Sequence, residues 1–187
     1  MEWDELKNIC EVCNRCQLAK TRNSVVFGVG DINSKILFVG EGPGYHEDMQ
    51  GEPFVGAAGQ LLDKMLGAIN LNRKNVYIAN IVKCRPPNNR DPQPEEINAC
   101  LPYLREQFKL LRPRIIVCLG RIAAKTIISP DFKITKSRGI WYNKKNIDII
   151  ATYHPSALLR DESKKRVAWE DLKSIRKRLD ERTIDNG

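Results

Sequence analysis

One stretch of the sequence decides the fold, and it reads ILFVGEGPG at residues 36–44. Its first part, Ile36 to Val39, is continuously apolar, which is typical of a parallel strand covered by helices on both faces. The run ends in three glycines that alternate with Glu41 and Pro43. Glycines of this kind let the backbone approach another group closely. The stretch therefore predicts a buried strand that delivers a carboxylate to the edge of a sheet.

Three further apolar runs have the same character, and helical periods lie between them. The runs are Val76 to Ala79, Ile115 to Leu119 and Ile147 to Ala151. Apolar residues at helical spacing occur at 62–69, 97–111 and 121–128, and a last helix is expected at 163–182. Strands that alternate with helices predict an α/β domain. We expect a three-layer α/β/α sandwich with a central four-stranded parallel sheet.

Prolines restrict the secondary structure that two segments of the chain can form. Pro102 would cost about 3 kcal/mol inside an unbroken helix, so the period at 97–111 predicts two helices or one kinked helix. The segment from Arg85 to Pro94 contains four prolines and two asparagines. Such a segment is too stiff and too polar for a strand, and we expect a loop.

Composition indicates one globular domain over residues 1–187 with a polyanionic partner. The chain has 187 residues, 42% of them hydrophobic, and a formal charge of +8. DNA, RNA and acidic membrane surfaces all fit this charge. No leader or membrane-spanning run is seen, so we expect a cytoplasmic protein.

Six cysteines in a reducing compartment favour metal ligation over disulfides. Cys13 and Cys16 form a C-x2-C pair, and Cys84 and Cys100 flank the proline-rich loop. Four thiolates suit zinc and an iron-sulfur cluster equally well, so spacing does not choose between them. Cys10 could replace Cys13, since C-x2-C-x2-C resembles a ferredoxin run. Cys118 lies inside an apolar run and is expected to be a buried, inert thiol.

Polar groups follow three of the predicted strands. They are the glycine segment with Glu41, then Asn80, then the run Tyr153-His154-Pro155-Ser156. Ligands of an open parallel sheet bind beyond the carboxyl ends of its strands, so these groups are expected to meet. A dinucleotide-binding turn is the alternative for the glycines. Pro43 lies inside the pattern and we expect no helix directly after it, which argues against that alternative.

Longer motifs are shared with a known family. They are VFG (26–28), GEGPG (40–44) with ED (47–48), PFVG (53–56) with AGQLL (58–62), NIVKCRPP (80–87) with NR (89–90), ITK (134–136), RG (138–139), WY (141–142), HP (154–155) and LLR (158–160). These motifs resemble the family 4 uracil-DNA glycosylases, the thermostable iron-sulfur type, and the resemblance covers about residues 13–180. Tyr45 and His46 depart from the acidic residues frequent in the family, and both are expected on a loop surface.

The resemblance implies a uracil-DNA glycosylase-like fold and a [4Fe-4S] cluster. Its ligands would be Cys13, Cys16, Cys84 and Cys100, with Cys10 outside the cluster. The N-terminal part of the domain is then a cluster-binding segment. We expect the cluster to act as a clip that does no chemistry.

The family pattern also implies a uracil pocket. Phe54 would stack on a base flipped out of the DNA, and the Asn80 amide would pair with uracil O4 and N3–H. Glu47 would exclude the thymine methyl group. Gly40, Gly42 and Asn89 are the remaining residues expected to bind substrate.

Catalysis is expected from two residues. His154 would stabilise the negative charge on the leaving base. Glu41 would orient the attacking water, with Asn89 as a lesser candidate for that task. A water nucleophile makes the enzyme monofunctional, so it would leave an abasic site without cutting the strand.

The expected partner is uracil-containing DNA, single- or double-stranded. Contacts would come from Pro43, Pro155 and Ser156, while Leu158 or Leu159 fills the vacated stack. The cations that could reach phosphates are Arg85, Arg90, Lys136, Arg138 and Arg160. A replication sliding clamp is a further candidate partner, and we expect a monomer that associates with the nucleoid.

Two other functions compete with this interpretation. A ferredoxin-like electron carrier would explain the cysteines but not the polar groups at the strand ends. An iron-sulfur or zinc DNA-binding module without glycosylase activity would explain charge and cysteines, and it predicts no base excision.

Overall fold

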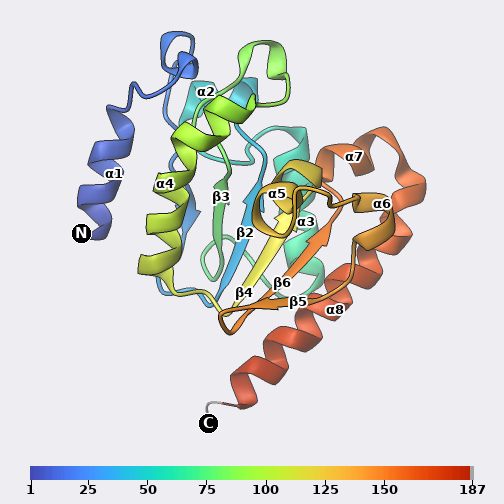
Figure 1. Ribbon diagram of the computed structural model, residues 1–187. Helices are drawn as coiled ribbons and strands as arrows, with labels where there is room; N and C mark the ends of the chain where they lie inside the picture. Colours follow the sequence, from blue (N-terminus) through green and yellow to red (C-terminus); the bar gives the residue numbers. More distant parts are fainter. Residues whose placement is uncertain (186–187) are drawn as a thin grey trace.

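The computed structural model describes residues 1–185, and the last two residues of the expected domain lie outside the described part. A mixed sheet runs through the middle of the molecule in the order β1-β3-β2-β4-β6-β5 (Figure 1). Its strands are β1 (Val29–Gly30), β2 (Ile36–Gly40), β3 (Tyr77–Asn80), β4 (Ile115–Leu119), β5 (Tyr142–Lys144) and β6 (Ile147–Thr152).

The four predicted strands are confirmed as a parallel set, but the sheet has two further strands that were not expected. Strands β3, β2, β4 and β6 pair in parallel, while β1 and β5 add antiparallel edges. The edge strands have only two and three residues and are partly exposed. They therefore lack the continuous apolar run by which the central strands were found.

Helices cover both faces of the sheet and confirm the three-layer architecture (Figure 1). One face packs against α3 (Ala57–Ala68), α7 (Pro155–Arg160) and α8 (Lys165–Ile184) through residues such as Leu62, Leu158 and Leu172. The other face packs against α4 (Pro94–Leu111) and α5 (Arg121–Ile127) through Leu104 and Ala124. The short elements are α2 (Tyr45–Gln50), α6 (Ile134–Ser137) and the 3-10 turns η1 (Gln17–Lys20), η2 (Pro87–Asn89) and η3 (Glu162–Lys164).

Helix α4 continues from Pro94 to Leu111 with Pro102 inside it, so of the two expected forms the segment is one helix and not two. The cost of the proline is offset by a long buried face that includes Tyr103, Leu104 and Leu111. A capping box between Gln93 and Glu96 also stabilises its first turn.

Helix α2 begins at Tyr45, directly after Gly44, where we expected no helix. Glu47 and Asp48 place negative charge in its first turn, which favours a helix N-terminus. Asp48 is buried and accepts hydrogen bonds from the backbone of Asn23 and Ser24. These contacts stabilise a helix too short to show a sequence period.

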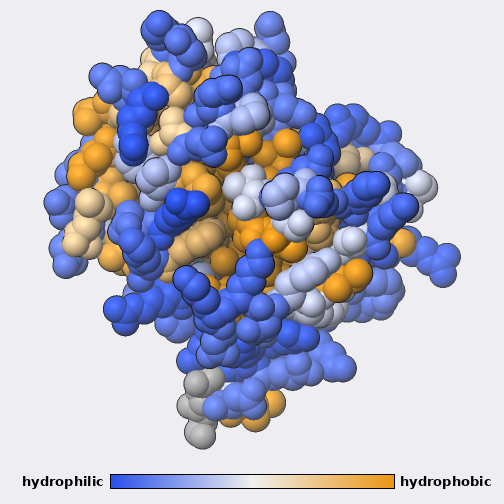
Figure 2. Space-filling view, in the orientation of Figure 1, coloured by the Kyte–Doolittle hydropathy of each residue, from blue (hydrophilic) through white to orange (hydrophobic). Residues whose placement is uncertain are grey.

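The N-terminal helix α1 (Trp3–Glu11) lies beside α4 at one edge of the molecule (Figure 1). It adds a small apolar cluster of Leu6, Cys10, Phe27 and Tyr103. The face drawn in Figure 2 shows hydrophobic residues in its centre and along its left edge, and hydrophilic residues over most of the remainder. Among the described residues, no helix has both the length and the apolar character needed to span a membrane.

Candidate functional site

A cleft of about 680 Å³ opens at the carboxyl ends of the parallel strands. Eleven of the residues predicted to act on substrate or DNA line it: Glu41, Gly42, Pro43, Glu47, Phe54, Asn80, Asn89, Arg90, His154, Ser156 and Arg160. Tyr45 and His46 also line the cleft from the start of α2, which corrects their expected place on a loop surface. The sequence-based site therefore comes together in one cavity.

The residues predicted to bind substrate or DNA that do not line the cleft are Gly40, Arg85, Lys136, Arg138, Pro155, Leu158 and Leu159. Gly40 lies behind the cleft, and its backbone packs against Asn80 and Phe54, which line the cleft. Leu158 is only 2% exposed and belongs to the hydrophobic core, whereas Leu159 is 48% exposed. Of the two leucines considered for the DNA stack, the structure favours Leu159.

Asn80 ends β3 and carries an unpaired acceptor. Its side chain is buried, and its Oδ1 is the one buried side-chain oxygen or nitrogen without a hydrogen-bond partner in the described residues. The main-chain carbonyl of Asn80 accepts from Nζ of Lys83 at 3.0 Å. An unpaired buried acceptor costs about 1–3 kcal/mol, so this oxygen is suited to a ligand that brings a donor.

Gly40 lies opposite Asn80 in the parallel register of β2 and β3. A Cβ atom at residue 40 would lie 2.5 Å from Asn80 Oδ1 and 2.6 Å from Cζ of Phe54. Both approaches are shorter than van der Waals contact. Glycine is therefore required here because the amide and the ring pack directly against its backbone.

The Phe54 ring stacks on the His154 ring inside the cleft. Their centroids are 5.4 Å apart and their planes differ by 28°. Phe54 also has a left-handed backbone with φ of 56°, a conformation that costs a bulky residue about 1–3 kcal/mol. Surrounding contacts have to hold this backbone in place.

His154 is held as a neutral imidazole. Its Nδ1 accepts the backbone N–H of Ser156 at 3.0 Å, with the Ser156 hydroxyl 2.7 Å away. Burial, followed by the nearby Arg160 charge, lowers the pKa of His154 to about 4, although Glu47 acts in the opposite direction. Because Nδ1 accepts, the ring proton of the neutral form lies on Nε2.

Glu41 follows β2 and shares the cleft with Asp91 and Arg121. Burial raises the pKa of Glu41 to about 7, with a further contribution from the charge and hydrogen bond of Asp91. The cations Arg121 and Arg160 oppose this shift. Arg121 donates to Asp91 Oδ2 at 2.5 Å and lowers the pKa of Asp91. Glu41 is thus a carboxyl group that titrates near neutral pH.

Sequence reasoning missed Asp91 and Arg121. Arg121 follows Gly120 at the carboxyl end of β4, so the rule that led to Asn80 and His154 could also have found it. Gly120 has φ of 92°, and a Cβ atom there would lie 2.9 Å from the Cβ of His154. No sequence pattern marked Asp91 as a functional residue, because it lies in the proline-rich loop among other polar residues.

Five cysteines line a second, small cavity of about 20 Å³. They are Cys10, Cys13, Cys16, Cys84 and Cys100, and the three cations Arg15, Arg22 and Lys83 line it with them. Among the residues described, no three Cys, His, Asp or Glu side chains form a group that could hold a metal ion as placed. Cys118 lies elsewhere, fully buried in β4, which agrees with an inert thiol.

The surroundings of the small cavity act on the sulfur atoms in two directions. Burial raises the pKa of Cys84 and raises that of Cys100 to about 11, while hydrogen bonds and nearby cations oppose this shift. Arg22 Nη1 donates to Cys84 Sγ at 3.4 Å, and the backbone N–H of Lys83 donates to Cys100 Sγ at 3.2 Å. Hydrogen bonds and nearby cations stabilise thiolates over thiols. A bound metal deprotonates the thiols that coordinate it, and these donors then stabilise the thiolates, so the residues present fit a metal group held by cysteine sulfur.

Two of the arginines considered for phosphate binding hold buried carboxylates instead. Arg90 forms two hydrogen bonds with Glu96, and Arg138 pairs with Asp171. Arg85 lies over the Tyr45 ring and donates to Asn89 Oδ1 at 2.7 Å. Arg90 and Arg160 both line the cleft, but the guanidinium group of Arg90 is paired with Glu96. Arg160 is therefore the best positioned of these cations to meet a phosphate at the cleft.

Known proteins are similar to this chain over most of its length. Residues 27–173 match the model of the Uracil DNA glycosylase superfamily. A type-4 uracil-DNA glycosylase of Archaeoglobus fulgidus is 47% identical over 87% of this chain and 86% of the relative. The corresponding protein of Sulfurisphaera tokodaii is 47% identical over 92% and 84%, and that of Thermotoga maritima is 44% identical over 88% of each chain.

Proposed function

The chain belongs to the Uracil DNA glycosylase superfamily and is a uracil-DNA glycosylase, and from that premise we propose how its residues divide the work of excision. The enzyme hydrolyses the N-glycosidic bond of deoxyuridine and leaves an abasic site. One observation carries the assignment of residues: the unpaired Oδ1 of Asn80 lies in the same cleft as Phe54, His154 and Glu41.

Asn80 reads the base. Its Oδ1 accepts from uracil N3–H, which removes the penalty of the unpaired acceptor, and its Nδ2 donates to uracil O4. Cytosine presents an acceptor at N3 and an amino group in place of O4, so both contacts would fail. The amide therefore selects uracil over cytosine, while Phe54 stacks on the face of the base.

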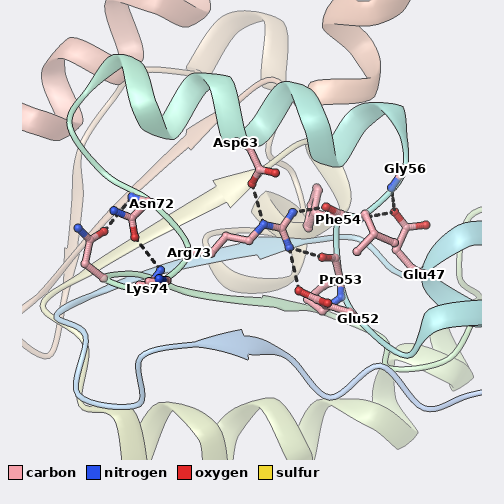
Figure 3. A network of polar contacts seen from close by, with 11 residues as sticks. Glu47, Glu52, Pro53, Phe54, Gly56, Asp63, Asn72, Arg73 and Lys74 are labelled. Carbon is pink, nitrogen blue, oxygen red and sulfur yellow. Dashed lines mark hydrogen bonds and ion pairs between the residues drawn. The ribbon is translucent and has the colours of Figure 1, made fainter.

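Glu47 completes the base-binding wall. Its Oε1 accepts from the backbone N–H groups of Val55 and Gly56, both at 3.1 Å (Figure 3). These bonds fix the carboxylate beside the segment that carries Phe54. A fixed side chain at the cleft wall can exclude the additional methyl group of thymine.

His154 stabilises the leaving group as a neutral donor. Since Ser156 occupies Nδ1, the proton on Nε2 is available to uracil O2 as the glycosidic bond breaks. A hydrogen bond that strengthens as charge develops on the base lowers the barrier. No proton has to be transferred in this step.

Glu41 acts on the sugar side. In its ionised form the carboxylate orients the attacking water and stabilises the positive charge of an oxocarbenium-like transition state. Asp91, which is paired to Arg121, tunes the proton affinity of Glu41 through charge and a hydrogen bond. Asn89, which also lines the cleft, is the lesser candidate for holding the water.

DNA binding uses the rim of the cleft. Pro43, Ser156 and Arg160 line it, and Pro155 begins α7 beside them. Leu159 is exposed on α7 and fills the space left by the flipped nucleotide. The preference for single- or double-stranded DNA, a sliding-clamp partner, a monomeric state and nucleoid association stay predictions.

We also propose that Cys13, Cys16, Cys84 and Cys100 hold a [4Fe-4S] cluster. When bound, the cluster supplies iron–thiolate bonds that clip the N-terminal segment to α4 and to the loop after β3. The cations and N–H donors around the cysteines support this proposal. Cys10 also lines the small cavity and packs in α1 with Leu6, Phe27 and Tyr103, and we place it outside the set on the family pattern.

Uracil release tests the function. The purified protein is incubated with an oligonucleotide that contains one deoxyuridine, with thymidine and deoxycytidine versions as controls. We expect free uracil and an abasic strand that breaks only after alkali treatment. A DNA-binding module without glycosylase activity, the competing function, would bind the oligonucleotide and release no base.

A further inference from the structure

The backbone around Phe54 is held from two sides. Phe54 has its left-handed conformation between Pro53 and Val55, and such a conformation persists only when neighbouring contacts impose it. On one side, Glu47 accepts the N–H groups of Val55 and Gly56. On the other side, the carbonyl groups of Pro53 and Phe54 need donors.

Arg73 supplies these donors. Its Nη1 donates to the Pro53 carbonyl at 2.8 Å, and its Nη2 donates to the Phe54 carbonyl. Figure 3 shows the guanidinium group between helix α3 and the Pro53–Phe54 segment. Two donors of one planar group therefore fix two successive carbonyls relative to each other. A lysine ammonium group, which is a point charge on a flexible side chain, cannot do this.

Arg73 is itself held by two carboxylates. Its Nε donates to Asp63 Oδ1 at 2.7 Å, and Glu52 Oε1 lies 3.6 Å from Nη1 (Figure 3). Asp63 belongs to α3, so the guanidinium group connects this helix to the segment that carries Phe54. Gly59 of α3 brings the same helix close, because a Cβ atom there would lie 1.8 Å from the Phe54 carbonyl oxygen.

Arg73 lies behind the cleft. Phe54 lines the cleft, whereas Arg73 is not among the described residues that line it. The side chain of Arg73 is 21% exposed, and its hydrogen bonds and ion pairs join it to Pro53, Phe54, Asp63 and Glu52. Any effect of Arg73 on the bound base has to pass through the segment that it holds.

We propose that Arg73 is a positioning residue for uracil recognition: its guanidinium fork fixes the backbone of Phe54 so that the ring lies against the flipped base. The proposal rests on the function given above, in which Phe54 stacks on uracil. It adds a specificity determinant outside the pocket that contacts neither the base nor the sugar. Losing the fork should move the ring and weaken uracil binding, while His154 and Glu41 stay in place.

The test compares Arg73→Met and Arg73→Lys with the wild-type enzyme. Arg176→Met is a matched control, because Arg176 also pairs with a carboxylate, Asp180, and donates to a backbone carbonyl, that of Ile69. For Arg73→Met we expect a fall in kcat/KM of about ten- to a hundredfold, since small misplacements at a site have effects of this size. The loss should come mainly from KM, inhibition by free uracil should weaken, and Arg73→Lys should be intermediate.

A double-mutant cycle separates positioning from general stability. If Arg73 acts through the ring, Arg73→Met should change kcat/KM by about twofold or less in a Phe54→Ala background, because the coupled partner is already gone. A merely structural role would give the same loss in both backgrounds. Should Arg73→Met fail to fold by circular dichroism, Asp63→Ala replaces it in the cycle and should lose uracil affinity in the same direction.

The outcomes are distinct. Kinetics of Arg73→Met equal to those of Arg176→Met, a loss of kcat alone with unchanged uracil inhibition, or a full loss in the Phe54→Ala background would each overturn the inference. A wild-type protein that releases no uracil would overturn the proposed function instead.

Discussion

The backbone N–H of Ser156 donates to Nδ1 of His154 across 3.0 Å, and this bond decides which ring nitrogen carries the proton. The neutral ring then offers Nε2–H to the leaving base. Donors that meet charge developing in a transition state contribute roughly 10²–10³-fold to kcat.

His154→Ala should therefore lower kcat by about 10²–10³-fold. DNA affinity should fall only modestly, because the donor acts mainly as the bond breaks. Single-turnover kinetics and fluorescence anisotropy measure the two quantities separately. Equal losses in rate and affinity would assign His154 to DNA contact instead.

The rate should rise with pH through about 7, the pKa to which burial and Asp91 raise Glu41. The carboxylate acts in its ionised form, so protonation below that pKa removes activity. The pKa of His154 is lowered to about 4, so its ring stays neutral across this rise. The profile of kcat/KM from pH 5 to 9 measures this rise in rate, and Glu41→Gln should abolish the rise.

Asp91→Asn should move that rise to lower pH. Asp91 raises the pKa of Glu41 by its negative charge and by a hydrogen bond, while Arg121 and Arg160 lower it. Burial, the largest cause of the raised pKa, remains in Asp91→Asn, but the contribution of the Asp91 charge is lost, so Glu41 ionises more easily. A profile of Asp91→Asn that superimposes on the wild type would show that the two carboxyl groups do not interact.

Asn80→Asp should weaken uracil excision and admit cytosine. A carboxylate still accepts hydrogen bonds but cannot donate to uracil O4, and it can accept from the cytosine amino group. Base release from matched deoxyuridine and deoxycytidine oligonucleotides measures the change, with Asn33→Asp at an exposed position as control. Unchanged uracil kinetics in Asn80→Asp would remove the assigned contact.

The iron content of single-cysteine variants should distinguish the cysteines that bind the cluster from those that do not. Alanine at Cys13, Cys16, Cys84 or Cys100 should lower iron and sulfide content and the melting temperature, because the clip is lost. Alanine at Cys118 or Cys10 should leave the iron content unchanged. Loss of iron in Cys10→Ala with retention in Cys13→Ala would exchange the roles of these two residues.

The sequence predicted the central strands and the gathering of polar groups at their ends because both depend on local patterns. Continuous apolar runs identify buried strands, and the carboxyl-edge rule then places Glu41, Asn80 and His154 together. The short α2 was missed, since Asp48 is fixed by a loop distant in sequence. The sequence could not choose between one helix and two at 97–111, since tertiary packing offsets the cost of Pro102. Arg73 could not be predicted, because its role arises only where α3 meets the backbone of Phe54.

Uracil recognition by this enzyme depends above all on one cavity in which Asn80, His154 and Phe54 surround the base. A crystal structure of the enzyme with free uracil tests this most directly. We predict N3–H on Asn80 Oδ1, O2 at Nε2 of His154 and the Phe54 ring stacked on the base. Uracil bound at another place, or bound in the cleft with Asn80 Oδ1 still unpaired, would contradict the account.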